Sequence, residues 1–521
     1  MNSLLALQFT PPDISFALIA PELIICIVGV VVMLVDAFAR PEQRWVTGGV
    51  SLAGLLAGAV ATIWLWLSWG GASQAFNGMI VLDELRLGFT LVFLVVSALT
   101  VLISMVWVEN ERLPAGEFHS LLMFATAGMM LMAAGGDLVI IFLGLEILSI
   151  ATYVMAGFRR TDVRSNESSL KYFILGSLSS AFLLYGIALI YGATALISGL
   201  PGTTNVAEIA RRLNDAQYPP LLFAGAAMML VGFGFKIATA PFHIWTPDVY
   251  EGAPTPVTAF MAAGPKAAGF ASFMRVFVFG FPFVAAAADK TVSGELHAAW
   301  VSVLVVLAIL TMTIGNVAAI VQNNVKRLLA YSSIAHAGYA LVGFIAAGAA
   351  STIEQRNAAI TAVTFYLLIY AVMNIGAFAV VQLIARAGDR RTEVEDYNGI
   401  GFQSPVLAFS LSLFLLSLLG MPLTAGFIGK IMVFRAALDQ GYVILVVIAV
   451  LNTAVSAYYY LRLIIVMFFR ERTTSWIAPP IPASIAIVLT ITAVGVLYLG
   501  LFPGLVINAL QSKPLVTLSL R

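Results

Sequence analysis

Long apolar stretches recur along the whole chain, separated by short connections that hold most of the polar residues. A helix that crosses a lipid bilayer needs about 20 consecutive apolar residues. We expect an all-α polytopic membrane protein with about fourteen transmembrane helices, at 14–35, 45–69, 87–107, 118–135, 137–157, 170–199, 219–241, 255–281, 296–320, 325–350, 357–386, 405–437, 442–469 and 483–505. Only a short turn from Ala134 to Asp137 separates the fourth and fifth of these stretches, so thirteen or fifteen spans stay open.

The composition agrees with a membrane location and excludes several functions. Of the 521 residues, 61% are hydrophobic and 10% are charged, whereas a soluble domain carries about 25% charged residues. A net charge of +1 provides no basic surface for nucleic acid. The single cysteine, Cys26, cannot form an internal disulfide or a Cys-ligated cluster, and four histidines leave little room for a metal site. We expect neither a metal nor a cofactor in this chain.

The positive charges in the connecting loops predict the orientation. With an even number of spans, both ends of the chain lie on one side of the membrane. If that side is the outside, fourteen Lys and Arg residues lie in the inner loops and seven in the outer loops and tails. Inner loops carry the excess of Lys and Arg in membrane proteins. We therefore expect a multi-pass protein with both termini outside.

Two distant apolar stretches share a six-residue pattern. Gly232–Ile237 in the seventh stretch and Gly426–Ile431 in the twelfth both read G-F-x-x-K-I, 194 residues apart. The two stretches are five positions apart in the order of predicted helices, an odd number, so they run in opposite directions, as an inverted repeat requires. A chance match is the alternative.

Each of these two stretches also contains a proline, Pro241 in the seventh and Pro422 in the twelfth. A proline removes a backbone hydrogen bond and kinks a helix. Freed carbonyl groups inside a bilayer are tolerated only against protein or a wet cavity, and broken helices at matching positions are typical of transport sites. We predict that the seventh and twelfth helices are broken.

Four charged residues lie in the middle of predicted spans: Glu146, Lys236, Lys266 and Lys430. Each costs about 2.5–3.5 kcal/mol at the centre of a bilayer. The lysines could instead extend their ammonium groups to the membrane surface. A buried lysine changes its proton affinity when a carboxylate approaches or leaves it, so Glu146 and Lys236 are the natural pair, with Lys266 an intermediate carrier and Lys430 the far station of a proton pathway.

His243 and His336 are candidates for links between these stations, because imidazole titrates near neutral pH. His336 is flanked by small residues, and it could simply bond a neighbouring helix. His243 could simply cap a turn. A bis-histidine haem is the remaining alternative, and no second helix offers a convincing partner.

The segment Lys236–Val257, which includes Pro241-Phe-His-Ile-Trp-Thr-Pro247 and Tyr250-Glu-Gly-Ala253, resembles the signature of the antiporter-like membrane subunits of respiratory complex I and of Mrp-type cation/proton antiporters. Asn324–Tyr339 resembles the same family. Phe158-Arg-Arg160 and Glu167–Phe173 resemble most closely its subunit N branch, the counterparts of mitochondrial NADH dehydrogenase subunit 2. The similarity covers essentially the whole chain.

The resemblance implies a single antiporter-like membrane domain over residues 1–521 with two inverted five-helix repeats, helices 4–8 at 118–281 and helices 9–13 at 296–469. It implies a subunit of NADH:quinone oxidoreductase that translocates protons in a bacterial cytoplasmic (inner) membrane, with the termini on the periplasmic side. NAD, FMN, iron–sulfur clusters and quinone would bind to partner subunits, and subunits M and K would be neighbours. The family's proton-transfer residues fall on Glu146, Lys236, Lys266, Lys430, His243 and His336, and a further polar pair falls on Glu167 and Lys171.

One position departs from the family pattern. The broken twelfth helix often reads Gly-x-Pro-Pro in the family, whereas this chain has Gly420-Met-Pro-Leu423. One proline is enough to break the helix. Three alternatives stay open: a stand-alone sodium/proton antiporter subunit of Mrp type, a structural spacer between other membrane subunits, and a plastoquinone-linked photosynthetic assembly.

Overall fold

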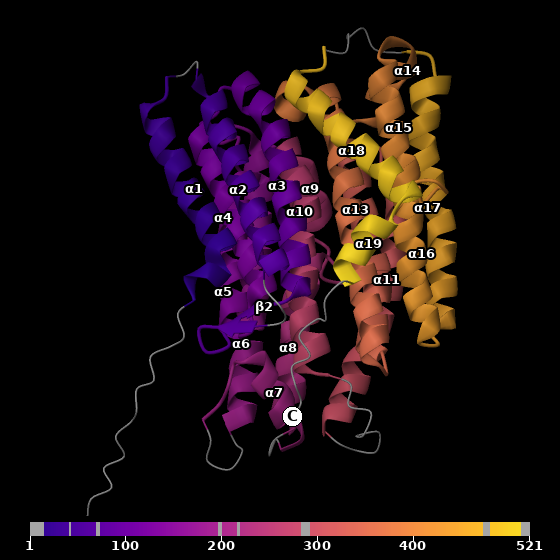
Figure 1. Cartoon of the computed structure of the whole chain (residues 1–521). Coiled ribbons are helices and arrows are strands. Elements are labelled where there is room, and N and C mark those ends of the chain that lie inside the picture. The colour runs from indigo at the N-terminus through magenta and orange to yellow at the C-terminus, as the bar shows by residue number, and fades with distance from the viewer. Residues whose placement is uncertain are drawn as a thin grey trace, which may run out of the picture.

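A computed structural model describes residues 15–40, 43–68, 73–195, 201–215, 219–282, 292–472 and 480–511. Most helices run along one common direction in two groups, with α1–α6 on one side, α11–α18 on the other, and α9 and α10 between them (Figure 1). The helices are α1 (Ala20–Phe38), α2 (Trp45–Ser68), α3 (Glu84–Asn110), α4 (Ala115–Ala134), α5 (Leu138–Ala156), α6 (Val163–Ala195), α7 (Val206–Arg212), α8 (Pro219–Ile237), α9 (Thr246–Gly252), α10 (Thr255–Met274), α11 (Val292–Ile320), α12 (Val325–Ala349), α13 (Ile353–Ala385), α14 (Ile400–Gln403), α15 (Pro405–Leu419), α16 (Ala425–Asp439), α17 (Val443–Phe469), α18 (Ala483–Leu501) and α19 (Gly504–Gln511).

The all-α membrane architecture is confirmed. Among the described residues, twelve helices are long and apolar enough to cross a membrane. The predicted span 255–281 is α10 followed by a π-helical segment, Arg275–Gly280, and the predicted span 405–437 is divided between α15 and α16. A small antiparallel hairpin of β1 (Ser73–Ala75) and β2 (Ile80–Leu82) is added at one end of the helices.

The short turn between the fourth and fifth predicted spans does separate two helices. The α4 helix ends at Ala134, and the Asp137 carboxylate accepts a hydrogen bond of 2.8 Å from the Val139 amide at the start of α5. Such a cap satisfies one of the backbone amides that a helix leaves unpaired at its amino end. The two helices then pack closely, since a Cβ atom on Gly144 would lie 2.8 Å from the Gly128 carbonyl oxygen. Small residues permit this approach.

The seventh and twelfth predicted helices are interrupted, as expected. However, each helix ends before its proline and does not continue through a kink at it. The α8 helix ends at Ile237, before Pro241, and Ala238 has a positive φ of 62°. The α15 helix ends at Leu419, where Gly420 has a φ of 91°. Pro241 and Pro422 therefore lie in the non-helical connections to α9 and α16. The helix end predicted at 241 lies at Ile237, and the span predicted at 405–437 is two helices, the second ending at Asp439. Each predicted repeat, 118–281 and 296–469, contains one interruption; their inverted relation stays a prediction.

A buried cluster of charges joins the two groups of helices at one end. The Asp389 carboxylate, just after α13, contacts Arg159 at 2.9 Å and Lys326 at 3.1 Å. It also accepts hydrogen bonds from the backbone amide and hydroxyl of Thr255, the first residue of α10. Arg159 in turn binds the two carboxylate oxygens of Glu111 at 2.6 Å each. Asp389 thus caps α10 and connects it to α12, α13 and the α5–α6 loop.

Burial by itself would raise the pKa of Asp389, but the Lys326 and Arg159 charges outweigh it and hold the pKa at about 2. A carboxyl group whose pKa is lower in the folded chain than in the unfolded chain stabilises the fold above the unfolded value. That stabilisation is lost as the pH falls through the folded value. The relevant window therefore runs from about pH 4 down to about pH 2.

We predict that Asp389→Asn lowers the free energy of unfolding near pH 7 by about 3 kcal/mol, because it leaves two buried cations without their shared carboxylate. Between pH 4 and pH 2, the free energy of unfolding should fall by about 2 kcal/mol less in the variant than in the wild-type chain, because the variant has no carboxylate to protonate at position 389. Thermal unfolding of the purified chain in detergent at several pH values measures both effects. Asp215→Asn, at an exposed position after α7, is the control and should change little. An unchanged acid profile in Asp389→Asn would contradict the assignment.

Candidate functional site

The structure places the three mid-span lysines inside the protein. Lys236, in the last turn of α8, Lys266, in the middle of α10, and Lys430, in the second turn of α16, are 5%, 2% and 4% exposed. None of them extends to the surface, so the alternative of surface-seeking lysines is wrong. Glu146, on α5, is partly buried.

The first station is built around Lys236. Its ammonium donates a 2.9 Å hydrogen bond to the Ser149 hydroxyl, on the helix that carries Glu146, and lies 5.9 Å from the centre of the Tyr172 ring. The described residues form no ion pair between Lys236 and Glu146. A cavity of about 10 Å³ borders Lys236 and Ser149, which is room for about one water molecule. One buried oxygen of Glu146 has no partner among the described residues.

Aromatic side chains continue from this station toward Lys266. The Tyr172 ring stacks on Trp245, with 4.6 Å between ring centres, and Trp245 meets Tyr250 edge-on at 6.0 Å. The Tyr250 hydroxyl lies beside Ser333. Lys266 donates to the Ser333 carbonyl oxygen at 2.6 Å and to its hydroxyl at 2.5 Å. The groups between the first two lysines therefore come from α6, from the segment after the α8 interruption that includes α9, and from α12.

His336 lies between Lys266 and Lys430. The Tyr370 ring is 5.9 Å from the Lys266 ammonium and 5.0 Å from the centre of the His336 ring. The two His336 ring nitrogens lie 2.7 Å from the Tyr366 hydroxyl on α13 and 3.3 Å from the Tyr460 hydroxyl on α17. His336 therefore bonds neighbouring helices, as its plainer interpretation held, and it does so on the line between two buried lysines.

Lys430 completes the row at the second helix interruption. Its ammonium donates a 2.8 Å hydrogen bond to the carbonyl oxygen of Leu419, the last residue of α15, and lies 4.8 Å from the centre of the Tyr339 ring. A cation is favoured at the carboxyl end of a helix, where carbonyl groups lack partners. A Cβ atom on Gly420 would lie 3.0 Å from the Lys430 side chain. The glycine thus provides both the positive φ and the space for the lysine.

The other predicted links lie apart from this row. Glu167 is exposed, and Lys171 bridges it to Asp248 of α9 at 2.7 Å on each side. Arg327, at the start of α12, contacts the same aspartate at 2.6 Å. His243 follows the α8 interruption, half-buried, and its buried Nδ1 has no partner among the described residues. Glu167, Lys171, Asp248 and Arg327 therefore form a cluster near the surface, and no hydrogen bond or ion pair of the described residues joins His243 to it.

The sequence reasoning missed the hydroxyl groups that separate the charged residues. They are Ser149, Tyr172, Tyr250, Ser333, Tyr339, Tyr366, Tyr370 and Tyr460. Spacing offered a signal for some of them, because Tyr366 and Tyr370 lie four residues apart on one face of an apolar helix. Ser333 likewise precedes His336 by three residues.

Comparisons with known proteins agree with this arrangement. The family described as "NADH:quinone oxidoreductase/Mrp antiporter, TM" matches residues 135–456. NADH-quinone oxidoreductase subunit N of Trichlorobacter lovleyi is 45% identical over 96% of this chain and 96% of its own length. A chain of respiratory complex I from Thermus thermophilus, solved with bound aureothin, is 35% identical with a TM-score of 0.75, covering 94% of this chain and 99% of that one.

The Mrp complex from Dietzia contains a chain of the same fold, with a TM-score of 0.79 at 21% identity, covering 95% of this chain and 96% of that one. At that identity the likeness concerns the fold alone. The near full-length relatives at higher identity, together with the membrane-spanning helices, make this protein an integral membrane subunit of a multi-subunit complex. The chain belongs to the family of NADH-quinone oxidoreductase subunit N, an antiporter-like subunit of the membrane arm of that proton-translocating complex.

Proposed function

We propose that this chain itself moves protons, through the row Glu146, Lys236, Lys266, His336 and Lys430, while other subunits carry out NADH oxidation and quinone reduction. The observation that carries the proposal is the burial of three lysines whose ammonium groups meet only hydroxyl and carbonyl oxygens among the described hydrogen-bond partners. Ionisable residues inside a membrane are typical of proton relays. The residues of the row come from five helices, α5, α8, α10, α12 and α16.

Each station can pass a proton by exchange between a lysine and a neighbouring hydroxyl or imidazole. Lys236 can give a proton to water in the adjoining cavity through Ser149, and Lys266 can exchange one with the Ser333 hydroxyl. His336 can take a proton at one ring nitrogen and release one at the other, with Tyr366 and Tyr460 fixing the ring. A change in the distance between Glu146 and Lys236 would alter the proton affinity of the lysine. That change is the step by which a conformational signal could start a transfer.

Protons would enter beside the α8 interruption. Glu167, Lys171 and Asp248 gather titratable groups at the surface, and His243 lies between that surface and Lys236 along the chain. The positive-inside rule assigns this side to the cytoplasm of a bacterium, with both termini on the periplasmic side of the inner membrane. Residues 1–14 and 512–521 lie outside the described structure.

The assembly we propose has antiporter-like subunit M and small subunit K as neighbours. NAD, FMN, iron–sulfur clusters and quinone would bind in other subunits, and this chain would hold no redox centre. Residues 118–281 and 296–469 would be inverted repeats, each with one broken helix and one lysine beside the break. Proton pumping that requires sodium and persists without NADH oxidation would favour the Mrp-type alternative instead.

We predict that Lys236→Met and Glu146→Gln each lower proton pumping coupled to NADH oxidation by about tenfold or more, because each removes a proton-transferring group. The complex should still assemble, since neither residue forms an ion pair in the described structure. Reconstituted vesicles with a pH-sensitive dye measure the pumping, and Arg40→Gln, at an exposed loop position, is the control. Normal pumping by an assembled Lys236→Met complex would contradict proton transfer through Lys236 and would favour the structural-spacer alternative.

We predict that Ser149→Ala lowers coupled pumping by about tenfold, because a hydrogen bond to a charged group contributes about 1.5–3 kcal/mol. The matched control is Ser302→Ala, whose exposed hydroxyl bonds only its own helix, to the Ala298 carbonyl oxygen at 2.7 Å. Both variants remove one serine hydroxyl from a membrane helix. Equal pumping in the two variants would show that the Lys236–Ser149 contact plays no part in proton transfer.

A further inference from the structure

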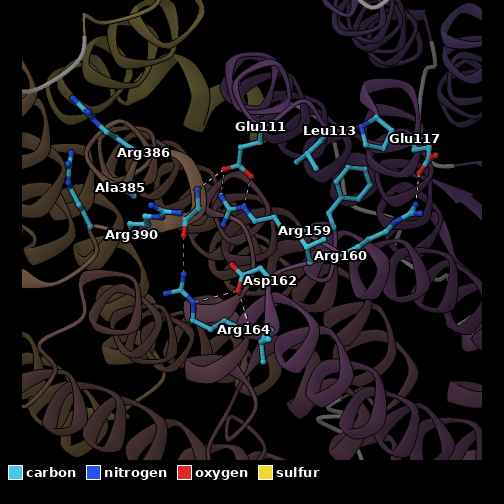
Figure 2. A pocket seen from close by; sticks show the side chains of 16 residues that line it. Glu111, Leu113, Glu117, Arg159, Arg160, Asp162, Arg164, Ala385, Arg386 and Arg390 are labelled. Carbon is cyan, nitrogen blue, oxygen red and sulfur yellow. Dashed lines mark hydrogen bonds and ion pairs between the residues drawn. The ribbon is translucent and has the colours of Figure 1, made fainter.

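A large cavity opens at the end of the molecule that holds the Asp389 cluster, away from the lysine row. Its volume is about 1150 Å³, and its walls come from the α3–α4 connection, the α5–α6 connection and the end of α13. Figure 2 shows Arg159, Asp162 and Arg164 near its centre, with Arg386 and Arg390 on the α13 side. None of the buried lysines lines it.

The charge of the lining is strongly unequal. Six arginines face three carboxylates: Arg159, Arg160, Arg164, Arg386, Arg390 and Arg391 against Glu111, Glu117 and Asp162. The carboxylates contact the first three arginines, with Arg159–Glu111 at 2.6 Å, Arg160–Glu117 at 2.9 Å and Arg164–Asp162 at 3.7 Å. The segment 386–391 adds three more guanidinium groups on the facing wall. Among the lining side chains alone, the arginines exceed the carboxylates by three, and the Asp389 carboxylate behind the lining offsets part of this excess through its contact with Arg159.

Apolar side chains border these arginines. Leu113, Pro114 and Phe158 line the same cavity, and Val163, at the start of α6, is 78% exposed. The cavity thus lies where membrane helices begin and end, which is the level of lipid headgroups. Arginine pairs with phosphate through two parallel hydrogen bonds, and basic pockets at helix ends on the cytoplasmic side suit anionic lipid headgroups.

We propose that this cavity binds the phosphate group of an anionic phospholipid, with Arg390 and Arg391 as its principal contacts and the acyl chains leaving past Val163. A phospholipid fits better than a free phosphate because the guanidinium groups and the exposed Val163 side chain share one opening. The ligand would lie next to the Arg159–Asp389 contact that caps α10.

The test uses the assembled complex, stripped of lipid and titrated with a phosphatidylglycerol that carries a photoreactive acyl chain. Cross-linking to residues 157–164 is measured against lipid concentration. Each Arg near a membrane surface contributes about fivefold in affinity. The double variant Arg390→Gln/Arg391→Gln should therefore raise the half-saturating lipid concentration by about 30-fold. Arg390→Lys/Arg391→Lys keeps the charge and should recover most of the binding.

The matched control is Arg40→Gln/Arg470→Gln, which removes two exposed arginines that do not line this cavity. It should leave the cross-linking curve unchanged. Equal curves for the cavity and control variants would overturn the proposal. So would inhibition by inorganic phosphate with no lipid cross-link, which would assign the site to a free anion, or cross-linking of an Arg390→Cys chain to a neighbouring subunit, which would assign the cavity to a protein contact.

Discussion

A chain that crosses a bilayer has to satisfy its backbone amide and carbonyl groups within its own helices, because lipid offers no hydrogen bonds. This protein departs from that rule inside its core, after Ile237 and after Leu419. At the second departure the released Leu419 carbonyl accepts a hydrogen bond from Lys430. At the first, Lys236 occupies the last turn before the break and Trp245 donates to the Phe235 carbonyl oxygen. The second break therefore stabilises a cation directly, whereas at the first break an indole N–H satisfies a released carbonyl and the lysine reaches Ser149 instead.

The spans could be predicted because an apolar run of about 20 residues has few other uses. The breaks could be predicted only approximately. Pro241 and Pro422 indicate the right neighbourhoods, but the helices end where Ala238 and Gly420 adopt positive φ angles. Those backbone conformations depend on what packs against them, such as the Lys430 side chain over Gly420, and a local sequence window does not contain that information.

The candidate site could also be predicted only in part: the charged residues could be named from the sequence, but their contacts could not. A lysine inside an apolar helix is conspicuous in a sequence, so all three buried lysines could be named in advance. Their partners could not, because serine and tyrosine occur on many membrane helices and only the packing decides which hydroxyl faces inward. Lys236 finds its acceptor 87 positions away at Ser149, and Lys266 finds Ser333 67 positions away. The exposure of Glu167 likewise depends on how α6 packs.

Buried charge in this protein is of two kinds, and the difference separates structure from function. At the helix ends, buried arginines contact carboxylates, as Arg86 does with Glu22 at 2.7 Å and Arg275 with Asp83. Removing a proton or a partner from such a pair leaves an uncompensated charge, which costs several kcal/mol. The mid-membrane lysines are held by neutral oxygens in the described structure. A lysine bound in this way can lose its proton without leaving a carboxylate unpaired, and that property suits a group that must be charged and neutral in turn.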